Sequence, residues 1–194
     1  MPTVITRASK QKRMMQFYNM MKQHSMAYIC VAYDDRWTNR PVVPVETDTI
    51  VENEHCTILG YQTYENMKFV QVIMNPTEEQ KEDPNVIFYK DSYYTAITNP
   101  DYALELGYTR LMLTFVLNKD EYFPTTNPDG SAVMFNQLGL YTEVDPASLA
   151  DTYFISKEDF NNLSNKGMLE IIDNRSIQSR ADDQKEEIYL MIEF

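Results

Sequence analysis

Residues 110–117, RLMLTFVL, are apolar at almost every position. A strand that faces solvent on one side alternates apolar and polar residues, whereas a strand covered on both faces is apolar throughout. This run therefore predicts a central strand, buried on both sides. A chain of 194 residues is long enough to bury a core of that kind, in one domain or a small two-lobed one.

Several other short runs have the composition of strands. They are rich in β-branched and aromatic residues and comprise 26–33, 68–74, a hairpin of 86–89 and 93–97, 132–141 and 168–172. The end of the chain alternates apolar with other residues, and its apolar positions are Ile188, Leu190, Ile192 and Phe194. That period of two predicts a final strand with one apolar face.

Three segments have helical signals. Met14, Phe17, Tyr18 and Met21 recur at helical spacing after a possible cap at Ser9, which predicts an amphipathic helix with a basic outer side. Thr49 and Glu52 fit a capping box for a short helix that reaches about residue 60. Ser156 caps a third helix, which Gly167 follows.

These elements predict an α+β fold, a two-layer α/β sandwich built from the N- and C-terminal segments. We expect residues 1–60 and 108–194 to form this main domain and residues 61–107 to form a small β-rich insertion. The final strand, 187–194, is expected in the same sheet as residues 26–33, because neither end of the chain can bury its apolar face alone.

Charge is unevenly distributed along the chain. Residues 1–40 contain seven basic and two acidic side chains, a balance of +5, and the whole chain carries −12, so the remainder carries −17. An acidic body of this kind repels phosphates, which disfavours nucleic acid as a partner. No apolar stretch has the length of a membrane span, so no membrane association is expected.

Residue types needed for catalysis or cofactor binding are scarce. Only five glycines occur, which leaves little for a phosphate-binding loop, and His24 and His55 lack a second ligand at metal spacing. Cys30 and Cys56 lie in apolar runs without CxxC spacing and are expected to be buried and free. Residues 125–136 fail as a calcium loop at the first and last ligand positions. We therefore expect no catalytic residue, metal or cofactor.

Several segments, in order, carry a family resemblance. They are VITRASKQKRMMQFYNMM with YICVAYDDRW, then PVETDTI, DEYFP after an apolar strand, MFNQLGLYTEVDP, and the ending IDNRSIQSRADDQKEEIYLMIEF. Together they resemble the small baseplate wedge subunits of contractile-tailed bacteriophages, the family of the gene-eight product of T-even-type phages. That subunit carries long inserted β domains in its middle, so this chain resembles a shortened form.

The resemblance implies a structural role in the phage tail baseplate, in the virion, with assembly in the host cytoplasm. It implies a homodimer that binds other baseplate wedge proteins and has neither catalysis nor a cofactor. Two alternatives stay open from the residues alone. One is a phage or bacterial enzyme, or an enzyme accessory, with an unrecognised site. The other is an acidic inhibitor that mimics nucleic acid.

A proline-rich loop at 34–47 is the first candidate contact segment, because a stiffened loop loses less entropy when it binds. Its single tryptophan is an anchor residue of the kind found at interfaces, although it could also pack into its own domain. A second candidate is the aromatic and proline run after residue 121. The candidate interface residues are Trp37, Arg40, Pro44, Asp48, Tyr122, Phe123 and Pro124.

Overall fold

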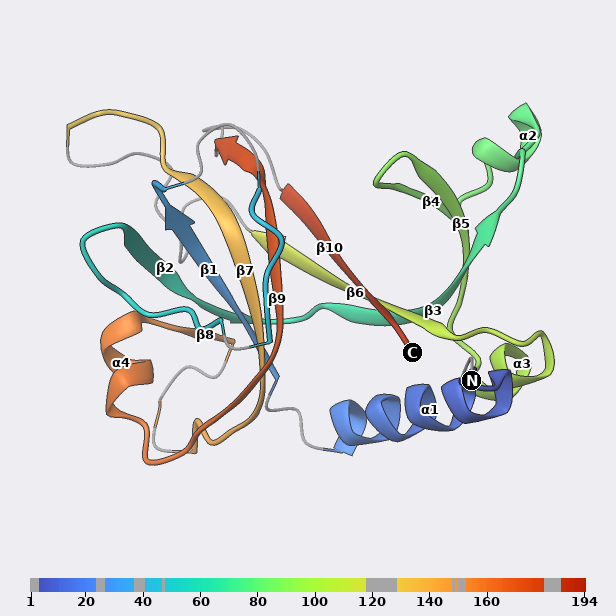
Figure 1. Ribbon diagram of the computed structural model, residues 1–194, viewed down its shortest axis with the longest axis horizontal. Helices are drawn as coiled ribbons and strands as arrows, with labels where there is room; N and C mark the ends of the chain where they lie inside the picture. The colour runs from blue at the N-terminus through green and yellow to red at the C-terminus, as the bar shows by residue number, and fades with distance from the viewer. Residues whose placement is uncertain are drawn as a thin grey trace. The chain divides into compact units, whose positions relative to one another are not determined.

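A computed structural model describes residues 4–23, 27–36, 41–46, 48–117, 129–147, 149, 153–179 and 186–194. These residues form ten strands and four helices, and the strands make two five-stranded sheets (Figure 1). The cores of the two sheets involve different parts of the chain, and each is described by itself below.

The first sheet has the strand order β8-β2-β1-β7-β9. Its strands are β1 (Tyr28–Asp34), β2 (Cys56–Thr63), β7 (Met134–Val144), β8 (Phe154–Ile155) and β9 (Lys166–Ser179). All pairings between neighbours in this sheet are antiparallel. The middle strand β1 is buried at every position but Tyr33, as a strand flanked and covered by others must be.

Aromatic packing closes one end of this sheet. The short helix α4 (Lys157–Asn162) begins at Ser156, whose hydroxyl accepts a hydrogen bond from the Asp159 amide. This confirms the predicted cap. The helix brings Phe160 onto Tyr61 of β2, with ring centroids 3.7 Å apart and nearly parallel planes. Tyr141 of β7 meets both rings edge-on and completes the cluster.

The second sheet has the strand order β10-β6-β3-β5-β4. Its strands are β3 (Asn66–Ile73), β4 (Val86–Tyr89), β5 (Ser92–Ile97), β6 (Arg110–Leu117) and β10 (Glu186–Glu193). Every position of β6 after Arg110 is buried, which confirms the strand predicted from its continuous apolar run. The short helices α2 (Glu78–Lys81) and α3 (Pro100–Glu105) lie in its connections.

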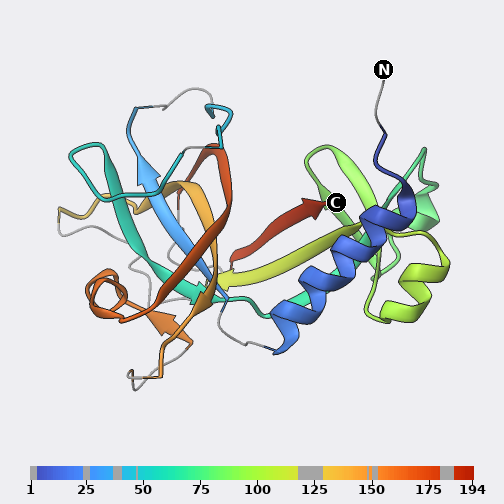
Figure 2. The same cartoon turned by 60° about the horizontal axis from the view of Figure 1, so that its bottom comes forward.

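The long helix α1 (Arg7–Gln23) packs on one face of β3 and β6 (Figure 2). Met14 and Tyr18 are buried there, and the Tyr18 ring lies 4.8 Å from that of Phe69. The predicted apolar stripe is confirmed. The predicted cap is not, because the helix begins before Ser9 and the Ser9 amide donates to the Thr6 hydroxyl.

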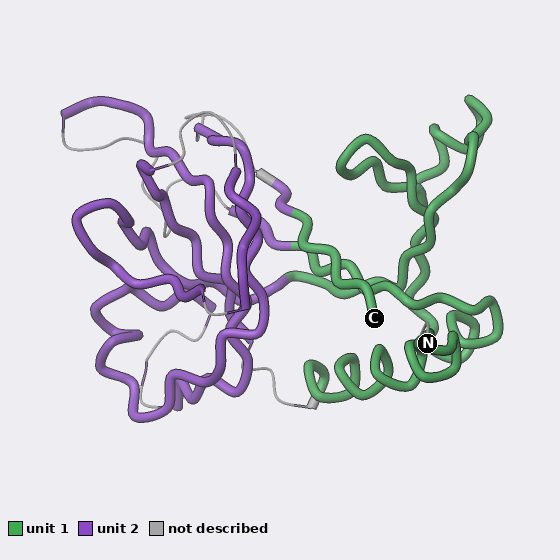
Figure 3. The backbone as a smooth tube through the Cα atoms, viewed as in Figure 1, with its two compact units in different colours: residues 1–23, 65–114, 189–194 green, residues 24–64, 115–188 purple. Residues whose placement is uncertain are grey.

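The chain divides into two compact units (Figure 3). Unit 1 comprises residues 1–23, 65–114 and 189–194, and unit 2 comprises residues 24–64 and 115–188. Each unit is therefore assembled from separate stretches of chain. The predicted division into a main domain of 1–60 with 108–194 and an insertion of 61–107 stays a prediction.

The predicted fold class is wrong. The described residues form two antiparallel β sheets with few helices, not a two-layer α/β sandwich. Part of the error lies at 49–60, where β2 stands in place of a helix because alternate residues Cys56 and Ile58 face the core. The final strand was also assigned to the wrong sheet, since β10 lies beside β6 while β1 lies between β2 and β7.

Candidate interaction surface

The seven predicted interface residues divide into two groups. Pro44 and Asp48 are described, half-buried and exposed respectively. The others lie outside the described residues: Trp37, Arg40, Tyr122, Phe123 and Pro124. The structure describes residues 41–46 at the end of the first candidate loop and residues 48–51 after it, and we call these two stretches together the valine segment.

The valine segment exposes apolar side chains to solvent. Val43 is 82% exposed and Val45 is 61% exposed, and Val42 and Val51 are each more than half exposed. Single exposed apolar residues are ordinary on protein surfaces, but a group within one short segment is typical of a contact site. Chemically, this surface can bind another apolar surface.

A closed turn shapes the middle of the segment. The Val45 amide donates to the Asp48 carboxylate at 2.8 Å, and the Asp48 amide donates back to the Val45 carbonyl at 2.9 Å. Together with Pro44, this reciprocal pair restricts the backbone that presents Val43 and Val45. Asp48 was predicted as an interface residue, and in the structure its carboxylate shapes that surface.

Ile50 fastens the segment to the first sheet. Its side chain is 5% exposed and belongs to the apolar core of unit 2. It fits there because β7 has glycine at position 139: a Cβ on Gly139 would come within 2.4 Å of Ile50 Cδ1 and 3.0 Å of Leu169 Cδ1. A glycine inside a strand often marks such a close approach.

A series of hydrogen bonds attaches the N-terminal end of the valine segment to the first sheet. Asn174 of β9 donates through Nδ2 to the Val42 carbonyl at 2.9 Å. The Asn174 amide oxygen in turn accepts a hydrogen bond at 2.9 Å from Gln137, whose side chain is buried under the same sheet. The backbone at Val42 is thereby tied to the sheet, so its side chain is exposed from a restrained position.

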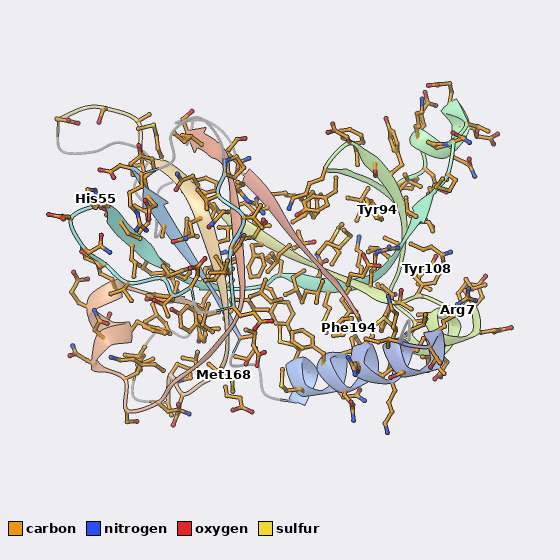
Figure 4. All side chains as sticks on the ribbon, in the orientation of Figure 1. Arg7, His55, Tyr94, Tyr108, Met168 and Phe194 are labelled. Atoms are coloured by element: carbon orange, nitrogen blue, oxygen red, sulfur yellow. The ribbon has the colours of Figure 1, made fainter. Side chains whose placement is uncertain are left out.

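The segment's C-terminal neighbours are also held. The Asn53 side chain donates to the Val51 carbonyl and accepts from the amides of His55 and Cys56. Lys157 of α4 pairs with Glu52 at 2.7 Å. The His55 ring lies 3.0 Å from Asp35, just before β2, where Figure 4 labels it. These contacts place the turn that leads from the valine segment into β2.

Strand β1 ends in a buried carboxylate just before the candidate loop. The Asp34 amide donates to the Asn136 side-chain oxygen and the Asn136 amide group donates to the Asp34 carbonyl, both at 2.7 Å. The Asp34 carboxylate pairs with Arg36. Burial acts to raise the pKa of Asp34, but the hydrogen bonds and charge of Arg36 outweigh it, so the pKa lies below its ordinary value of 3.8.

The groups most often used for chemistry include cysteine thiols and clusters of metal-ligating side chains. Cys30 and Cys56 are free and buried, as predicted, and burial, with a smaller contribution from Asp34, raises the pKa of Cys56 to about 11. A thiol with that pKa stays protonated at neutral pH and is a poor nucleophile. No group of three or more His, Cys, Asp or Glu side chains suited to a metal occurs among the residues described.

Sequence reasoning missed the residues that hold the valine segment. Ile50, Gly139 and Asn174 are far apart in sequence, and their contacts depend on the sheet order. One sequence signal could have indicated the close approach of Ile50: Gly139 is one of only five glycines and lies inside a predicted strand.

Comparison with known proteins places the chain in a family. None of the helices in the described residues combines the length and apolar character of a membrane span.

No curated protein matches the chain. A family profile described as "Baseplate wedge 3 tail fiber network component" matches residues 5–194, nearly the whole chain. This match confirms the resemblance to a phage baseplate wedge subunit. The chain belongs to the baseplate wedge 3 tail fiber network component family and is a structural component of the phage tail baseplate.

Proposed function

We propose that this chain works as a protein-docking part of the baseplate wedge, and that its valine segment binds a neighbouring baseplate protein. The observation that carries the proposal is the exposure of four valines from a backbone that is hydrogen-bonded on both sides of them. Burying a valine side chain completely is worth roughly 1.5–3 kcal/mol. A restrained segment keeps more of that gain, because less conformational entropy is lost on binding.

The family resemblance supports three finer proposals. The chain forms a homodimer, it assembles in the host cytoplasm into a contractile tail, and it needs no cofactor and performs no catalysis. Size-exclusion chromatography with light scattering tests the first of these, because a dimer has twice the 22.8 kDa of one chain. A mass equal to one chain across the concentration range would contradict it.

The other candidate interface residues remain proposals of the same kind. Trp37 and Arg40 precede the valine segment in sequence, and the run from Tyr122 to Pro124 lies far downstream of it. Trp37→Ala tests the first of them. If Trp37 binds a partner, assembly is lost while monomer stability is unchanged. If the protein is destabilised but still assembles, the tryptophan belongs to the core of its own unit.

Val43→Asp tests the docking surface directly. Val43 is almost fully exposed, so the change should leave the melting temperature unchanged while it places a charge in the contact. Met74→Asp is the matched control, because Met74 is 78% exposed, in unit 1, and gains the same charge. We expect the Val43 variant to lose the complex with co-expressed baseplate wedge proteins and the Met74 variant to keep it. Assembly of both variants like wild type would contradict the proposal.

A further inference from the structure

A cavity of about 360 Å³ in unit 1 is lined by three basic side chains. They are Arg7 and Lys10, from the first turns of α1, and Arg110, from the start of β6. Among the described residues no carboxylate lines this cavity. Its size lies within the roughly 300–1,000 Å³ of ordinary ligand pockets. The chain as a whole has 29 acidic and 17 basic residues, so a cavity whose charged lining residues are all basic is unusual for it.

Among the described residues, one of the three bases pairs with an acidic side chain. Arg110 pairs with Glu193 of β10 at 2.8 Å. Within the described part of the chain, no acidic side chain pairs with Arg7 or Lys10. Helix α1 itself contains no acidic residue that could do so, whereas α2, α3 and α4 each carry acidic residues in their first turns. Two positive charges at the cavity therefore have no acidic partner among the residues that the structure describes.

The backbone leaves room for one of these charges. Gly107 has a φ of +81°, and a Cβ there would lie 3.3 Å from the Arg7 guanidinium and 3.4 Å from its Cδ. The missing side chain lets Arg7 lie along the α3–β6 connection, next to Tyr108, and Figure 4 labels both residues in this region. Gln11 supports the arrangement, because its amide donates to the Leu104 carbonyl at 2.7 Å and ties α1 to α3.

The rest of the lining mixes polar residues, among them Gln71 and Thr109, with aliphatic ones. Ile5, Val70 and Val72 contribute to the walls. A mixed wall of this kind suits a carboxylate carried on an apolar peptide segment, since the bases bind the charge and the aliphatic groups cover the adjoining side chains. It suits a hydrated phosphate chain less well, because such a chain has no apolar side chains for the aliphatic groups to cover.

We propose that this cavity binds an acidic segment of a neighbouring protein, with a carboxylate held by Arg7 and Lys10 and an apolar side chain against the exposed Ile5 and the half-buried Val72. The site lies in unit 1, whereas the valine segment lies in unit 2. The proposal is thus independent of docking through the valine segment, and either can fail without the other.

Fluorescence polarisation with a short labelled peptide rich in Glu and Leu tests the proposal. The test variant is Arg7→Gln/Lys10→Gln. The matched control is Lys12→Gln/Arg13→Gln, which removes the same charge from exposed positions of α1 that do not line the cavity. We expect the test variant to bind at least about tenfold more weakly and the control to change little, because hydrogen bonds between charged groups contribute strongly where they are made. Melting temperatures of both variants should match wild type.

Four results would overturn the proposal. The test variant could bind as tightly as wild type, or both variants could weaken equally, which would indicate a general field and no pocket. Tighter binding of a single-stranded oligonucleotide of equal charge would indicate a nucleic-acid site, and full competition by inorganic phosphate a simple anion site. Loss of self-association in the test variant alone would assign the cavity to a second copy of this chain.

Discussion

At the scale of single residues, Asp34 is a buried and paired charge of unit 2. Its side chain is almost fully buried, its only described ion pair is with Arg36, and its backbone is held by Asn136. Because the carboxylate is satisfied in the folded state, its pKa is lower there than in the unfolded chain. The stability that it contributes is therefore complete above the ordinary pKa of 3.8 and is lost as the pH falls through the lower folded value.

Asp34→Asn should reduce the free energy of unfolding at pH 7 by roughly 1.5–3 kcal/mol, because a hydrogen bond to a charged group usually contributes that much to stability. The difference between variant and wild type should shrink as the pH falls below about 3.8. Urea unfolding at pH 7 and at pH 3 measures both effects. Asp35→Asn is the control, because that carboxylate is half exposed and should matter little. A difference that does not change with pH would contradict this account.

The two cysteines allow a second test at this scale. Because both thiols are buried and the pKa of Cys56 is raised to about 11, they should react with a thiol reagent at pH 8 only as fast as the protein opens. Both should react promptly in urea. Fast reaction of a thiol in the native protein would show that its surroundings are open.

At the scale of elements, the sheets depend on pairs of residues that sequence patterns do not connect. Gly139 and Ile50 are such a pair, since the glycine makes the space that the isoleucine fills. Gly139→Ala should cost about 1–3 kcal/mol through overpacking and should loosen the valine segment. Hydrogen exchange at residues 41–51 measures the second effect.

Ile50→Val supplies the control for that variant. It removes Cδ1, the atom that the new methyl group would strike, and by itself should cost about 0.5–1.5 kcal/mol. In the Gly139→Ala background it should instead restore stability, so the two changes should compensate. Simple additivity of the two losses would contradict the packing described here.

Strand β10 gives a further test of an element. Leu190 is 2% exposed, so Leu190→Asp should cost several kcal/mol by burying an unpaired charge. Glu187→Asp, at an exposed position of the same strand, should change little. Thermal melting compares the two. An unchanged melting temperature for the Leu190 variant would mean that the strand is exposed in solution.

Local patterns predicted the elements far better than their arrangement. The continuous apolar run of β6, the stripe of α1 and the cap at Ser156 each depend on neighbours in sequence, and all three were found. The capping signal at Thr49 misled, because tertiary packing of Cys56 and Ile58 in a sheet outweighed a local preference. The sheet that receives β10 is a long-range choice, which an apolar face alone does not specify.

At the scale of the whole molecule, the family match and the exposed contact surfaces both indicate a role in protein assembly. The family match covers residues 5–194 and gives a structural role in the baseplate. The described surface offers apolar contact at the valine segment and basic contact at the cavity of unit 1. Of the seven interface residues expected from sequence, Pro44 and Asp48 lie in that segment. The side chains that hold it in place could be found only once the sheet order was known.

The central claim is that the valine segment contacts another baseplate protein in the assembled tail. The most direct measurement places a photo-crosslinking amino acid at position 43 and, as control, at position 74, and irradiates assembled baseplates. We predict that position 43 crosslinks to a different baseplate protein, identified by mass spectrometry, and that position 74 does not. Baseplates that assemble with the probe at position 43 and give no crosslink there, or give one only to a second copy of this chain, would contradict the claim.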